Sequence, residues 1–598
     1  MDGFPANAVD ALQTGNPAIA EQLCRQRLAE RPRDETAVAL LPVALARQAR
    51  HDEALPLFAR LARDHPAEAA HRVNLGYAQL AVGQVDAAIQ TFDHAMRRFP
   101  AEPALGLGLG QACLQKGWVA RTIEVLQPVL RAAPHDAYAA ALLARALVEA
   151  GDRQAEAAQL AEQLLAARIE DPATLTELAL ALIGLQRDAD AESCLHRAVA
   201  IEPDDDTARL HLAQLQERQN RTSDAAATLA AVSAERRHDA LWLIARARLH
   251  RRARELDEAD ALLCRIGDDA PTPVRAEAAT EHGKVLHELG RHEDAFACFV
   301  EANKLTHALE VANFGAADDG QGPDWMLRTY AASEVATWSP APAPAAHTPI
   351  FVVGFPRSGT TLLENMLDAH PGLQALEERP AVDAMLATLQ SGAPLDQALA
   401  RLDDSLAGAA RESYWAAVSR HLALRADARL VDRYPLNMAR LAVISRVFPG
   451  APIVLAVRHP CDVVLSCFMQ NFHIRDRTPG FHTLLNGARI YDRLMHKWVA
   501  EAAAFAPRLH VIRYEDLVTD VSGHAQRLAA FLGIEGETAL LDYAEHALRR
   551  GRIHTPSYAQ VVQPIYRSAV MRWKSYAGHF GPALALLTPW IQHWGYEE

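Results

Sequence analysis

Residues 349–361 read PIFVVGFPRSGTT, a short apolar run followed at once by a glycine-containing turn. The run at 350–353 predicts a buried strand, and a helix is expected over 362–370. Glycines allow a tight turn, so backbone N–H groups, the helix start and the hydroxyls of Thr360 and Thr361 can converge on one anion. The stretch therefore predicts a loop that binds a phosphate-like group.

The chain after this loop continues the same pattern. Short apolar runs at 430–431, 453–457 and 511–512 alternate with helical stretches. Runs of this kind, buried on both faces, are typical of parallel strands covered by helices. Residues 349–598 are therefore expected to form one α/β domain of the P-loop type with a parallel sheet.

The chain before the loop is a repeat array. Its prolines and glycines recur every 34 residues, at Pro32, Pro66, Pro100 and Pro134, and at Gly83, Gly117 and Gly151. A 34-residue period with small, large and helix-ending positions predicts paired helices, and it resembles the tetratricopeptide repeat. The register loosens later and returns near Gly283 and Phe299. Residues 1–310 are expected to form an all-α solenoid, which serves either as a groove for a peptide or partner helix or as a rigid spacer or oligomerisation arm.

A proline- and alanine-rich stretch separates the two halves. Residues 339–349 read SPAPAPAAHTP, which favours an extended, semi-rigid linker. The predicted organisation is a solenoid over 1–310, a connecting segment over 311–348 and the α/β domain over 349–598.

Composition excludes some classes of partner. The 598 residues carry a formal net charge of −14, which does not favour a large nucleic-acid or membrane footprint. Seven scattered cysteines show no metal-ligand spacing, and neither a secretory signal nor a membrane span is recognisable. A cytoplasmic protein without nucleic-acid, membrane or metal partners is expected, and its oligomeric state stays open.

The anion loop differs from that of kinases and ATPases. Thr360 stands at the position where a Walker A loop has lysine, and the cation Arg357 comes earlier. The run PRSGTTLLENMLDAHP, followed by Glu377 and Glu378, resembles the 5′-phosphosulfate loop of sulfotransferases, in particular tyrosylprotein sulfotransferases and related bacterial enzymes. The resemblance implies 3′-phosphoadenosine 5′-phosphosulfate (PAPS) as donor and no metal. A P-loop kinase is disfavoured.

Further segments carry the same resemblance. Arg458 follows the run at 453–457, and Ser466 lies about two helical turns later, a pair like the family's 3′-phosphate site. Tyr514 matches a nucleotide-side position, and Arg572 lies in a segment that in the family closes over the nucleotide. The resemblance implies donor contacts at Arg357, Ser358, Gly359, Thr360, Thr361, Arg458, Ser466, Tyr514 and Arg572.

Sulfuryl transfer to a hydroxyl requires a group that accepts the acceptor's proton. Glu378 matches the family's glutamate for this role, although two solvated acids in a loop are the alternative. Arg433 stands where the family usually has lysine; it can stabilise the departing phosphate but stays protonated. Ser557 matches a contact to the transferring group, and His482 is a reserve candidate for the base.

Two functions remain open at this stage. The first is a PAPS-dependent sulfotransferase acting on a hydroxyl acceptor held by the solenoid groove; protein tyrosine, carbohydrate and small phenols are all candidates. The second is a tetratricopeptide scaffold whose sulfotransferase-like domain binds nucleotide without turnover. Neither half of the chain has a pattern that identifies the acceptor.

Overall fold

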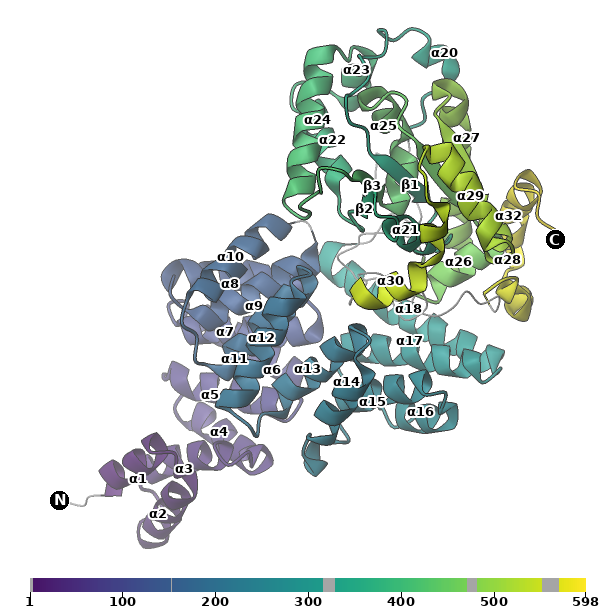
Figure 1. The fold of residues 1–598 in the computed structure, drawn as a ribbon. Coiled ribbons are helices and arrows are strands. Elements are labelled where there is room, and N and C mark those ends of the chain that lie inside the picture. Colours follow the sequence, from purple (N-terminus) through teal and green to yellow (C-terminus); the bar gives the residue numbers. More distant parts are fainter. Residues whose placement is uncertain (1–3, 152, 316–327, 471–480, 551–568, 598) are drawn as a thin grey trace.

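The computed structural model describes residues 4–151, 153–315, 328–470, 481–550 and 569–597. A helical array, coloured purple to teal in Figure 1, lies beside a green-to-yellow domain built around a sheet. None of the helices in these ranges is long and apolar enough to span a membrane.

The first part consists of helices joined by short turns, and most neighbours in sequence pack in pairs. The helices are α1 (Phe4–Gln13), α2 (Pro17–Glu30), α3 (Glu35–Ala46), α4 (His51–Asp64), α5 (Ala69–Ala81), α6 (Val85–Arg98), α7 (Pro103–Lys116), α8 (Val119–Ala132), α9 (Ala137–Ala150), α10 (Gln154–Ala166), α11 (Pro172–Gly184), α12 (Asp188–Ile201), α13 (Asp206–Arg218), α14 (Thr222–Ala230), η1 (Ala234–Arg236), α15 (Ala240–Arg252), α16 (Leu256–Leu263), α17 (Thr272–Glu288) and α18 (His292–Phe314).

Close packing in two of the repeats depends on glycine facing a large side chain. A Cβ at Gly76 would lie 2.3 Å from Cζ of the buried Phe92, and one at Gly283 would lie 2.6 Å from Cε1 of Phe299. Such distances admit no side chain, so glycine is required where the two helices meet. The predicted repeat architecture is confirmed.

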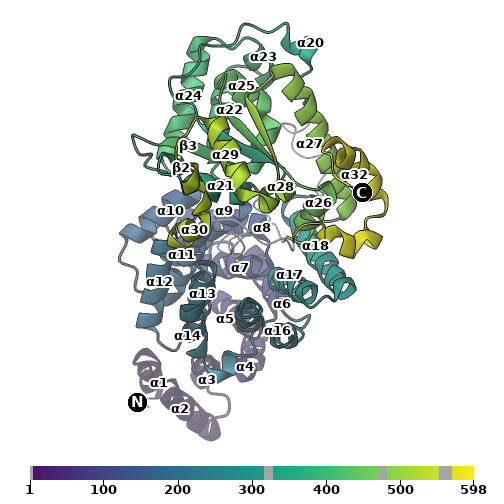
Figure 2. The same ribbon diagram turned by 45° about the vertical axis from the view of Figure 1, so that its right-hand side comes forward.

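The array curls until its last helix reaches the turn between α7 and α8. Asn313 at the end of α18 donates from Nδ2 to the Gly117 carbonyl oxygen at 2.7 Å, and its Oδ1 accepts from the Ala120 N–H at 3.0 Å. Figures 1 and 2 show the helices lying against one side of the second domain. Residues of the array and of the sheet domain line one common cleft.

The second domain contains a five-stranded parallel sheet in the order β2-β3-β1-β4-β5. Its elements are α20 (Ala332–Val335), β1 (Ile350–Gly354), α21 (Thr360–Asp368), β2 (Leu373–Ala375), α22 (Ala381–Gln390), α23 (Leu395–Ala400), α24 (Asp404–Ser419), β3 (Arg429–Arg433), η2 (Pro435–Arg440), α25 (Leu441–Val447), β4 (Ile453–Val457), α26 (Pro460–Phe468), α27 (Leu484–Phe505), β5 (Leu509–Arg513), α28 (Tyr514–Thr519), α29 (Val521–Leu532), η4 (Glu537–Leu541), α30 (Tyr543–Arg550), η5 (Arg572–His579) and α32 (Gly581–His593).

The register of the sheet places the predicted site residues together. Central β1 pairs Ile350 with Val431 of β3 and Phe351 with Ile453 of β4. Because all strands run in parallel, the anion loop, the end of β3, Arg458 and Tyr514 follow the carboxyl ends of neighbouring strands. This edge of an α/β sheet is where ligands bind. The predicted α/β class is confirmed.

The last repeat and the second domain share a hydrophobic core. Phe299 of α18 belongs to the same buried cluster as Phe351 and Phe468. Asn303 Nδ2 also donates to the Phe468 carbonyl oxygen at 2.8 Å. The array is therefore attached to the sheet domain by packing as well as by the chain connection.

The proline-rich connection follows the surface of the sheet domain and contains no helix or strand from Ser339 to Pro349. The Ser339 N–H donates to the Ala400 carbonyl oxygen, and the Ala343 N–H donates to Asp404 Oδ1, each at 2.8 Å. These bonds fix the connection on the sheet domain.

Candidate functional site

The anion loop lies between β1 and α21 and depends on two glycines. A Cβ at Gly354 would lie 2.5 Å from the Ala456 carbonyl oxygen, and Gly359 has φ +99°. Arg357 also takes a left-handed conformation, with φ +71°. The first N–H groups of α21 have no partner inside the helix, so the loop presents backbone donors beside a positive helix end.

Side chains from α26 and α28 close around this loop. Arg357 Nε donates to Ser466 Oγ at 3.2 Å, and Arg458 Nη1 donates to the Arg357 carbonyl oxygen at 3.3 Å. The Arg458 guanidinium lies 5.1 Å from the Tyr514 ring centroid. The structure therefore brings together four of the residues that the sequence assigns to nucleotide binding.

Two buried donors at the anion loop lack a hydrogen-bond partner in the described part of the chain. They are Ser358 Oγ and Arg458 Nε, on residues that are 2% and 6% exposed. An unsatisfied buried polar group costs about 1–3 kcal/mol. A phosphate or sulfate oxygen reaching either atom would remove that cost, so the loop suits an anionic ligand.

The end of β3 holds a buried ion cluster. Arg433 is 0% exposed; its Nε and Nη2 lie 2.9 and 2.7 Å from Glu364 Oε2, and Nη1 donates to Glu378 Oε1. Burial alone would lower the pKa of Arg433, but the two carboxylates outweigh burial and raise it. The Glu378 side chain is 30% exposed and lines the adjoining cleft. Arg433 therefore positions Glu378, a role that sequence reasoning missed.

Asp432, the neighbour of Arg433 in β3, is a second buried acid that the sequence analysis did not single out. Burial raises its pKa to about 7, opposed by a hydrogen bond of 2.8 Å from Tyr414 Oη and by the charges of Arg440 and Arg433. Unfolded aspartate has a pKa of about 3.9. Between these values the native state binds more protons than the unfolded chain, so Asp432 contributes stability below about pH 4 that is lost as pH rises through about 7.

Replacement Asp432→Asn is expected to flatten the fall in unfolding free energy between about pH 4 and pH 7, since asparagine has no proton to lose in this range. Urea unfolding at a series of pH values measures the effect. Asp427→Asn is the control because the Asp427 side chain is 83% exposed. An unchanged pH slope in the Asp432 variant would contradict the assignment.

The remaining predicted site residues lie in different places. Thr360 and Thr361 begin α21, and Arg572 begins η5; all three line the cleft. Ser557 falls outside the described residues, so its predicted role stays a prediction. His482 does not line the cleft, and its Nε2 lies 2.6 Å from Glu310 Oε2 in α18.

One cleft of about 2050 Å³ connects the site with the inner face of the helical array. Lys284 of α17 lines the cleft together with Arg357. Burial lowers the pKa of Lys284; Glu281 opposes that effect, and nearby arginines, including Arg357, reinforce it. Sequence reasoning missed this lysine, whose only signal was a polar position on a repeat helix. Further lining residues from the array are Gln115, Arg145, Glu177, His211, Arg248 and Arg251.

Family models agree with this division of the chain. The model described as "Sulfotransferase family" matches residues 349–538. Tetratricopeptide repeat models match residues 39–103, 79–146 and 189–249. The chain therefore combines a domain of the sulfotransferase family with tetratricopeptide repeats.

Related proteins match at modest identity. An uncharacterized protein of Aquifex aeolicus is 26% identical over 53% of this chain and 42% of its own length. Protein-tyrosine sulfotransferase 2 of Gallus gallus is 28% identical and protein-tyrosine sulfotransferase 1 of Homo sapiens 27% identical, each over 42% of this chain and 69% of its own length. The chain thus spans less than half of the Aquifex protein.

A crystal structure of a tetratricopeptide repeat protein from Parabacteroides merdae covers 46% of this chain and 98% of that chain at 12% identity. Its TM-score is 0.28, so this similarity supports no conclusion about the fold.

Proposed function

We propose that the protein transfers a sulfuryl group from PAPS to a hydroxyl acceptor. The observation that carries the proposal is the meeting of Arg357, Arg458, Ser466 and Tyr514 at the anion loop, with Glu378 in the same cleft. Sulfotransferase-family similarity over 349–538 supports the same reaction class.

The chemistry of the site residues fits an anionic donor. The loop N–H groups and Arg357 suit the 5′-phosphosulfate, and Arg458 with Ser466 suits the 3′-phosphate. The ring of Tyr514 is held beside Arg458. PAPS supplies the sulfuryl group, and these residues bind and orient it.

The proposed reaction makes one bond and breaks one. The acceptor oxygen bonds to sulfur while the bond between sulfur and the bridging phosphate oxygen breaks, so 3′-phosphoadenosine 5′-phosphate (PAP) departs with the electron pair. The acceptor proton passes to Glu378, which Arg433 holds in position. Positive groups around the loop, including Arg357, stabilise the charge that develops on the departing phosphate.

The donor loop gives a direct test. Gly359→Ala should weaken PAP binding about tenfold to a hundredfold, because a Cβ there would lie 2.7 Å from Tyr514 Cδ2 at φ +99°. That estimate corresponds to about 1–3 kcal/mol of strain. Gly450→Ala, at φ +78° with open space around it, is the matched control for calorimetry with PAP. Equal loss of affinity in both variants would contradict the assignment.

We further propose that the acceptor is a polypeptide, with tyrosine as the acceptor side chain. Ordinary small-molecule pockets measure about 300–1,000 Å³. The cleft of about 2050 Å³ exceeds that range and continues along the repeat array, so it has room for a peptide beside a nucleotide. Two relatives named protein-tyrosine sulfotransferase support this acceptor class.

Gln115→Trp should raise the KM for a tyrosine peptide at unchanged PAP affinity, because Gln115 is exposed inside the cleft on the array side. Transfer to a small phenol should be unaffected. Arg168→Trp is the control because the Arg168 side chain is 91% exposed and does not line the cleft. An equal KM for the tyrosine peptide in both variants would contradict a role of the array in acceptor binding. Tight PAP binding without transfer to any acceptor would favour the scaffold alternative.

A further inference from the structure

A cluster of metal-ligand types lies where the repeat array meets the sheet domain, on residues that do not themselves line the cleft. His307 and Glu310 come from α18, and His482 comes from the turn before α27. His482 Nε2 lies 2.6 Å from Glu310 Oε2, and His307 Nδ1 lies 4.0 Å from the same oxygen. The two imidazole centroids are 4.8 Å apart. Three donor side chains from two domains therefore converge.

This cluster is partly buried: the side chains of His482 and Glu310 are 16% and 17% exposed, and that of His307 is 42% exposed. His307 Nδ1 is also buried, and within the described residues it has no hydrogen-bond partner. A buried imidazole nitrogen beside a carboxylate and a second imidazole is a ready metal ligand.

We propose that His307, Glu310 and His482 bind a Zn²⁺-type divalent ion that joins the repeat array to the sheet domain. Zn²⁺ takes imidazole and carboxylate ligands at about 2.0–2.2 Å, which places tetrahedral neighbours about 3.3 Å apart. The observed spacings of 2.6 and 4.0 Å lie on either side of that value, and the three ligand atoms all lie within 4.8 Å of one another. Water completes the fourth position.

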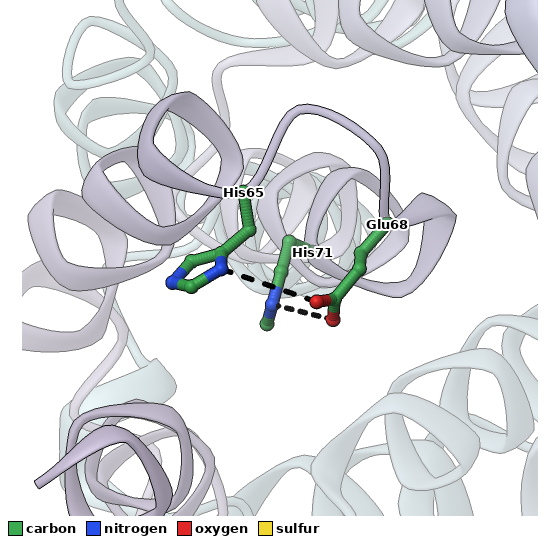
Figure 3. Close-up of side chains that lie close together, drawn as sticks. All are labelled: His65, Glu68 and His71. Carbon is green, nitrogen blue, oxygen red and sulfur yellow. Dashed lines mark ion pairs between the residues drawn. The ribbon is translucent and has the colours of Figure 1, made fainter.

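Two other clusters make weaker sites. His65, Glu68 and His71 lie together around the turn between α4 and α5 (Figure 3), but the Glu68 side chain is 60% exposed. In the cluster of Asp260, Cys264 and His282, Arg291 Nη1 lies 2.9 Å from Asp260 Oδ2 and competes with a cation.

The interdomain position gives the ion a structural role. On the same helix, Asn303 donates to the Phe468 carbonyl oxygen, and Phe299 belongs to the hydrophobic core of the sheet domain, so α18 already packs against that domain. An ion held by residues of α18 and of the turn before α27 would add a further link between the two parts. The ion would hold the walls of the cleft at a fixed distance and take no part in sulfuryl transfer.

Zn²⁺ titration of the metal-freed full chain against a chromophoric chelator tests the proposal. One tight site per chain is expected at the interface. His482→Gln should weaken Zn²⁺ binding at least about a hundredfold. Loss of an outer-shell partner costs up to about that factor, and His482 would be a direct ligand. Because His482→Gln also breaks the pair with Glu310, His307→Gln is the second variant; circular dichroism checks that both fold.

The double variant His65→Gln/His71→Gln is the control and should retain the tight site. Co²⁺ loaded into the wild type should give visible bands without a thiolate charge-transfer band, since no cysteine takes part. Absence of tight binding, loss of the site in the control, or a thiolate band would each overturn the proposal. The histidine and glutamate would then form only an ion pair.

Discussion

Glu378→Gln is expected to lower the rate of sulfuryl transfer about a hundredfold to ten-thousandfold, the usual contribution of a positioned general base. Glutamine keeps the shape of the side chain but cannot accept the acceptor's proton. Arg433 keeps its contacts to Glu364, so the buried charge remains paired and the fold survives. Single-turnover transfer from labelled PAPS measures the loss.

Glu377→Gln is the matched control, because it makes the same chemical change one residue away. It should keep most of the activity. Both variants should bind PAP as the wild type does, since the assigned donor contacts lie at the anion loop and at Arg458. A Glu378 variant as active as the Glu377 variant would remove Glu378 as the proton acceptor.

Arg433→Met is expected to destabilise the sheet domain by about 3–5 kcal/mol, because it leaves the buried Glu364 carboxylate without its ion pair. Methionine fills much of the volume, so the loss reports the charge rather than a cavity. Urea unfolding, followed by intrinsic tryptophan fluorescence, measures the change.

The double variant Arg433→Met/Glu364→Gln should recover part of that stability, because it removes the stranded charge. The unfolding free energy of Arg433→Lys should lie between those of the wild type and Arg433→Met, because lysine keeps the charge but cannot contact both carboxylates as the forked guanidinium does. If the unfolding free energy of Arg433→Met lies within about 1 kcal/mol of the wild-type value, the buried ion cluster does not stabilise the sheet domain.

Sequence patterns predicted the strands that have a clear apolar run. The runs at 350–353 and 453–457 match β1 and β4, and the runs at 430–431 and 511–512 lie inside β3 and β5. Strand β2 was missed because Leu-Gln-Ala is too short to show alternation. The helix expected from residue 362 begins at Thr360, since the threonines belong to its first turn.

The meeting of Arg357, Arg458, Ser466 and Tyr514 was predictable because these residues follow strand ends in a fixed order. The partners that act across the fold were not. Glu364 reads as a polar residue in an amphipathic helix, and only the packing of α21 beside β3 brings it to Arg433. Lys284 and the shared cleft depend on the curl of the array, which no local pattern specifies.

The most direct test of the central claim is transfer of labelled sulfuryl from PAPS by the full chain, with a tyrosine peptide library as acceptor. The account predicts labelled, acid-labile sulfate on tyrosine-containing peptides in the wild type and a loss of at least about a hundredfold in Glu378→Gln. A wild-type chain that binds PAP yet labels neither these peptides nor any component of a cell extract would contradict it.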